Sequence, residues 1–139
     1  MVDPAAPAAA EEIEMPLTVT PKEHGVGLFT VYPVGSLDSN TYQVLESQLQ
    51  TITATSPKSI IFDLKDLSYI SSAGVRVILA TKKVLKATGG DVVLTNLQPQ
   101  IRKVFDIIKA VPSVSIFESV EELDRYLDTM QKKVKEEGA

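Results

Sequence analysis

The sequence predicts an α/β protein with a mixed, mostly parallel β-sheet and helices. Strand-like and helix-like segments alternate in the order β-β-α-β-α-β-α-β-α. Such alternation is typical of parallel strands joined by right-handed helical crossovers. A short turn separates the first two strands, so they are expected to add one antiparallel pair. The length of 139 residues fits a single domain.

The first elements follow from residue type and spacing. Glycines at 25 and 27 mark a turn, and residues 28–34 are rich in the β-branched and aromatic residues that favour a strand. Apolar residues then recur at helical spacing over 41–52. Asp38 or Ser39 is a suitable N-cap for this helix, because its side-chain oxygen can accept an unpaired backbone N–H.

The later elements alternate in the same way. The apolar run at 58–64 is typical of a strand covered on both faces. Residues 75–87 favour a helix, which Gly89–Gly90 end. Residues 91–95 and 113–117 are predicted strands. The last two helices are indicated by an apolar stripe that includes Phe105 and by a capping box, in which Ser119 and Glu122 each serve the other's backbone N–H.

Composition excludes several classes of site. The chain has no cysteine and one histidine, which rules out disulfides, cysteine–zinc sites and cysteine nucleophiles. No glycine-rich phosphate-binding motif is present, so no cofactor is expected. Asp63 and Asp66 follow a strand, as magnesium ligands do in other α/β proteins, but no third ligand is near in sequence. We therefore expect no metal and no catalytic residue.

Charge and hydropathy separate a tail from a domain. Residues 1–15 are mainly Ala, Pro and Glu, with four acidic and no basic residues, and are expected to be a disordered tail before a domain at 16–135. The rest carries 14 acidic and 14 basic residues, which is unfavourable for nucleic-acid binding. No long apolar run or signal-peptide pattern is present. We expect a cytoplasmic protein that binds neither nucleic acid nor membrane.

The segment Tyr69–Gly74 is the remaining candidate for function. Ser71 and Ser72 lie between a predicted buried strand and the start of a helix. One hydroxyl there could cap the helix, which does not require two serines. A serine at this position could instead accept a phosphate, since the first helical N–H groups and the positive end of the helix favour an anion.

Several segments together resemble a STAS domain of the bacterial anti-sigma-factor antagonist family. The similarity covers roughly residues 16–130. It rests on the serine segment 67–74, on its neighbours 62–64 and 77–79, on residues 35–38 before the first helix, and on 89–94.

The resemblance implies a switch. In this family a partner that is both anti-sigma factor and serine kinase phosphorylates a serine at this helix start, and only the unphosphorylated protein binds that partner and frees the sigma factor. Alignment on Gly74 places the phosphoacceptor at Ser72, with Ser71 as second choice. A serine phosphatase is the implied second partner. The expected partner-binding residues are Asp38, Ser71, Ser72, Gly74 and Arg76.

The sequence departs from the family pattern beside this serine. The family often has aspartate where Ser71 stands, and serine where Ala73 stands. STAS-like domains also occur as scaffold subunits of stress-signalling or transport complexes, and this role is the main alternative. An enzyme or nucleotide-binding protein on a flavodoxin-like sheet is a third class, for which no nucleophile–base pair or phosphate loop is found.

Overall fold

The computed structural model describes residues 17–110 and 119–138. The predicted tail at 1–15 and the predicted strand at 113–117 lie outside the described residues. The described elements are β2 (Leu17–Gly25), β3 (Leu28–Leu37), α2 (Tyr42–Thr53), β4 (Ser59–Asp63), β5 (Leu67–Ile70), α3 (Ser72–Ala87), β6 (Asp91–Thr95), α4 (Pro99–Ala110) and α5 (Val120–Gly138).

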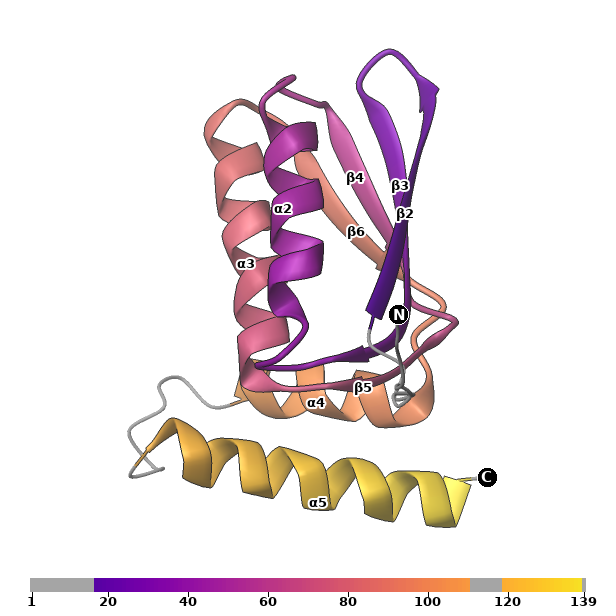
Figure 1. The fold of residues 1–139 in the computed structure, drawn as a ribbon, viewed down its shortest axis with the longest axis vertical. Coiled ribbons are helices and arrows are strands. Elements are labelled where there is room, and N and C mark those ends of the chain that lie inside the picture. The colour runs from indigo at the N-terminus through magenta and orange to yellow at the C-terminus, as the bar shows by residue number, and fades with distance from the viewer. Residues whose placement is uncertain (1–16, 111–118, 139) are drawn as a thin grey trace, which may run out of the picture.

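The sheet confirms the predicted architecture. Its strands run in the order β2-β3-β4-β6, and β5 pairs with β3. The β2–β3 hairpin is antiparallel, whereas β3–β4, β4–β6 and β3–β5 are parallel. Helices α2 and α3 lie side by side on one face of this sheet (Figure 1).

Strand β5 is not among the strands predicted from the sequence. The first half of β3 pairs with β4, and its last residues, 35–37, pair with β5. The register shifts at Gly35, whose φ of 114° lies in the left-handed region that favours glycine. The bend lets one strand serve two parallel neighbours, so the end of β3 lies beside the end of β5.

The core lies between the sheet and its helices. Ile60 and Phe62 are fully buried, but Ile61 on the opposite side of β4 is only half-buried. The prediction that β4 is fully covered on both faces is therefore wrong, because α2 and α3 pack on the same side. On α4, Ile101 and Val104 are fully buried, as their spacing predicts, while Phe105 is only partly buried against the core.

Helices α4 and α5 lie across the end of the sheet at which β5 runs into α3 (Figure 1). α5 packs mainly on α4 and also contacts α3. The Ser119 hydroxyl accepts the Glu122 N–H at 3.1 Å, as expected for the serine of the predicted capping box. This arrangement places α5 over the predicted serine site.

Candidate functional site

The candidate site is the junction of β5 and α3. Ser71 occupies the N-cap position of α3 with extended backbone, and its carbonyl accepts the Val75 N–H at 3.0 Å. The Ser71 N–H donates to the carbonyl of Leu37 at 2.9 Å, which ties the start of α3 to the end of β3. Ser71 is thus held at the helix start by backbone contacts.

The two serine hydroxyls are buried without a partner. Ser71 is 4% exposed and Ser72 8% exposed, and neither Oγ has a hydrogen bond within the described part of the chain. The expectation that a serine hydroxyl caps α3 is therefore wrong. Instead, Asp124 on α5 accepts the Ser72 N–H at 2.8 Å. Buried polar groups are rarely left unpaired, so these hydroxyls are the feature of the site that needs an explanation.

Gly74 lets α3 approach the sheet closely. A Cβ at this position would lie 2.6 Å from Cγ of Leu37 and 2.9 Å from Cγ1 of Ile70. Both side chains are fully buried and belong to the strands that flank the site. Glycine at 74 therefore fixes the distance between the serines and the ends of β3 and β5.

The loop after β3 carries Asp38 and begins beside the serines, because the Ser71 N–H is bonded to the carbonyl of Leu37. The N-cap of α2 is Thr41, so the choice of Asp38 or Ser39 for that position is wrong. Asp38 holds the turn just before the helix, where its Oδ1 accepts the backbone N–H groups of Asn40 and Thr41 at 2.9 and 3.1 Å. A side-chain acceptor in a turn of this kind is favourable in the same way as a cap.

Arg76 is exposed and lines a groove of about 470 Å³ together with Ser72 and residues of α3, α4 and α5. The structure thus gathers Asp38, both serines, Gly74 and Arg76 around the start of α3.

Three polar residues of α5 complete the site, and the sequence reading missed them. Asp124, Asp128 and Gln131 have the spacing i, i+4, i+7, which places them on one face of a helix. Gln131 is 1% exposed and bonds both backbone groups of Ile70, donating to its carbonyl at 2.8 Å and accepting its N–H at 3.0 Å. In sequence, these residues look like part of a solvated helix face.

Tyr69 of β5 forms a hydrogen bond with Asp128 of α5. Burial, the carboxylates of Asp128, Asp124 and Asp38, and a hydrogen bond with Asp128 together raise the pKa of Tyr69 to about 12. The phenol is therefore neutral at ordinary pH, and it donates toward α5.

The Tyr69→Phe variant should remove one pH-dependent part of the stability. The unfolded tyrosine ionises near pH ~10, whereas the folded one holds its proton to about pH 12. Above pH ~10 the unfolded state binds fewer protons, so the free energy of unfolding of the wild type falls as pH rises through this window. Denaturant unfolding across the window should show a shallower fall for Tyr69→Phe; equal slopes would contradict the burial of this phenol.

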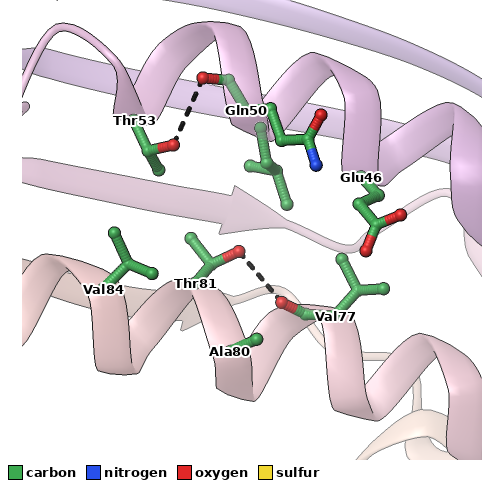
Figure 2. Close-up of a pocket in the computed structure, with 8 residues that line it drawn as sticks. Glu46, Gln50, Thr53, Val77, Ala80, Thr81 and Val84 are labelled. Atoms are coloured by element: carbon green, nitrogen blue, oxygen red, sulfur yellow. Dashed lines mark hydrogen bonds between the residues drawn. The ribbon is translucent and has the colours of Figure 1, made fainter.

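A second hollow lies between α2 and α3 (Figure 2). Its two threonine hydroxyls are engaged within their own helices: Thr81 donates to the carbonyl of Val77 at 2.9 Å, and Thr53 to that of Gln50 at 3.3 Å. Glu46 is the one carboxylate among its lining residues. The hollow offers no pair of reactive groups, so the serine junction is the better candidate.

Asp63 has structural partners of its own. Burial opposes its ionisation, but hydrogen bonds from the Lys65 backbone N–H and the Asn96 amide, both at 3.2 Å, and the Lys65 charge hold its pKa below the usual value. Within residues 17–110 and 119–138, no three His, Asp or Glu side chains are grouped so that they could hold a metal ion.

Comparison with known proteins identifies the family. The family model for the STAS domain matches residues 18–123, about three quarters of the chain. The chain belongs to the STAS family. The predicted family and fold class are thereby confirmed, and the serine junction lies well inside the matched STAS region.

Two relatives of this STAS domain carry names that state a role. "Putative anti-sigma factor antagonist BtrV" of Bordetella bronchiseptica is 38% identical over 73 residues, which are 52% of this chain and 63% of BtrV. "Anti-sigma F factor antagonist" of Paenibacillus polymyxa is 28% identical over 86 residues, 61% of this chain and 74% of that protein. The match to BtrV thus spans less than two thirds of its length.

A solved structure shows the same STAS fold. SpoIIAA, a Bacillus cell-fate determinant solved in its phosphorylated form, superposes with a TM-score of 0.57 at 24% identity, covering 66% of this chain and 83% of SpoIIAA. Within the described residues of this STAS domain, no helix combines the length and apolar character needed to cross a membrane.

Proposed function

We propose that this STAS domain is an anti-sigma-factor antagonist that phosphorylation of Ser72 switches off. The observation that carries the proposal is the pair of buried, unpartnered serine hydroxyls at the start of α3. Relatives named as anti-sigma-factor antagonists support the role. The partner is an anti-sigma factor that is also a serine kinase, and a serine phosphatase reverses the modification.

The chemistry of the switch is local. The kinase transfers the γ-phosphoryl group of ATP to Oγ of Ser72, which releases ADP and the hydroxyl proton. The modified side chain carries about −1.5 to −2 charges near neutral pH. At a packed interface this charge brings repulsion and a desolvation cost, so the phosphorylated protein no longer binds. The chain itself is not an enzyme in this scheme and works in the cytoplasm.

Ser72 is preferred to Ser71 for a structural reason. The Ser71 N–H is bonded to the end of β3, and Ser71 is the more buried of the two. Ser72 lines the groove together with Arg76, whose exposed side chain offers a positive charge. Asp38, Gly74 and Arg76 form the rest of the proposed partner-binding surface.

Binding to the anti-sigma factor tests the role directly. The candidate is the serine kinase encoded nearest to this gene, mixed with its sigma factor. Isothermal titration should show that the unmodified protein binds the kinase, and size-exclusion chromatography should show free sigma factor. If the kinase does not bind while the protein co-purifies with a stress or transport complex, the scaffold alternative replaces this proposal.

A further inference from the structure

Helix α5 covers the serine that the proposed switch uses. Oγ of Ser72 has essentially no exposed surface, and the contact that closes this side of the site comes from Asp124 of α5. Asp124 places a carboxylate on the backbone N–H of Ser72, where the positive end of α3 favours an anion. In the docked state, the protein's own carboxylate therefore occupies the anion-binding end of α3.

The remaining contacts fasten α5 to the strand before the serines. Gln131 makes two hydrogen bonds with the backbone of Ile70, much as a neighbouring strand would. Leu123 and Leu127 are buried in the core next to this polar stripe. The start of the helix is less tightly packed, because Val120 is 51% exposed and lines the open groove beside Ser72.

We propose that docking of α5 and a phosphate on Ser72 exclude each other. A phosphoryl group adds three oxygens to an atom that is already enclosed, so the groups around Oγ, with Asp124 of α5 among them, must move to admit it. Its negative charge would also lie beside Asp124, and like charges in a partly buried site repel. The phosphate and Asp124 compete for the same helix N-terminus.

On the proposed function, docking of α5 slows phosphorylation of Ser72, and phosphorylation in turn opposes docking. The kinase acts on the fraction of molecules in which α5 is undocked, so the rate of phosphorylation is scaled by that fraction. By linkage, phosphorylation holds α5 in the undocked state by the same free energy with which docking opposes phosphorylation. Asp124 is thus a regulatory residue that sets how readily Ser72 is modified.

Amide hydrogen exchange tests this without a kinase. The N–H groups of Ile70 and Ser72 are bonded to side chains of α5, whereas those of Ser71 and Val75 are bonded to backbone outside α5. If α5 undocks as a unit, the amides of Ile70 and Ser72 should exchange at least about tenfold faster than those of Ser71 and Val75, each relative to its rate in an unstructured peptide.

Two substitutions test whether Asp124 controls the exchange of these amides. Asp124→Asn weakens a charge-assisted hydrogen bond and should speed exchange at Ile70 and Ser72 about tenfold more, with no change at Ser71. Asp106→Asn, at an exposed position on α4, is the matched control and should change neither. Equal exchange at all four amides in the wild type, unaffected by Asp124→Asn, would overturn the proposal.

A second arm installs phosphoserine at position 72 during synthesis. Protection of the Ile70 amide should fall at least about tenfold, because its partner Gln131 leaves with α5. If the phosphoserine protein keeps full protection at Ile70, phosphate and docked α5 coexist and the proposal is wrong. Neither arm depends on a kinase, so a failure of the anti-sigma-factor role would leave these results unaffected and be recognised separately.

Discussion

The Gly74→Ala variant is expected to lose about 2 kcal/mol of its free energy of unfolding. Alanine normally favours a helix by about 1 kcal/mol over glycine. Here its Cβ would lie 2.6 Å from Leu37 and 2.9 Å from Ile70, both fully buried. Overpacking typically costs about 1–3 kcal/mol, because backbone or core side chains must shift. Contacts this short with two fully buried side chains place the cost near the upper end of that range, which leaves a loss of about 2 kcal/mol after the gain in helix propensity.

Gly25→Ala is the matched control for this substitution. The nearest atom to a Cβ there is Cδ1 of Leu28 at 3.9 Å, an ordinary contact. Urea unfolding of both variants should show a loss at least twice as large for Gly74→Ala. Equal losses would mean that α3 does not approach β3 and β5 as closely as the structure shows.

The second large effect is expected on partner binding. Ser72→Asp should weaken binding of the anti-sigma factor at least about tenfold, since it places a negative charge where the partner packs. Ser72→Asn is the matched control, because it has the same size and disturbs the enclosed position equally but carries no charge. The difference between the two isolates the electrostatic part of the proposed switch.

Titration calorimetry with the kinase gives this comparison. If Ser72→Asn weakens binding as much as Ser72→Asp, size and not charge controls the interface. If neither variant binds more weakly than the wild type, position 72 lies outside the interface, and the proposed partner surface is wrong.

Much of the fold was predictable, because strand and helix periodicities are local properties. The hairpin turn, α2, β4, α3, β6 and the buried stripe of α4 all follow from spacing and from Gly and Pro positions. Strand β5 was not predictable in this way. It has four residues, and it is a strand because the bend of β3 at Gly35 brings a partner to it.

The site was predictable only in part. Two serines before a helix pointed to the position, and the resemblance gave it a role. The burial of both hydroxyls was not foreseeable, because α5 packs back on the β5–α3 junction, which lies more than 50 residues earlier in the chain. Asp124 and Gln131 look solvated in sequence, because an amphipathic helix does not reveal which of its polar residues face another backbone.

Intact-mass measurement tests directly whether Ser72 accepts a phosphate. The wild type, Ser72→Ala and Ser71→Ala are each incubated with the cognate kinase and ATP, and their intact masses are recorded. Ser72→Ala should remain folded, because it removes a hydroxyl that has no hydrogen-bond partner among the described residues. We expect one added phosphate on the wild type and on Ser71→Ala and none on Ser72→Ala. If Ser72→Ala gains a phosphate as readily as the wild type, Ser72 is not the phosphoacceptor.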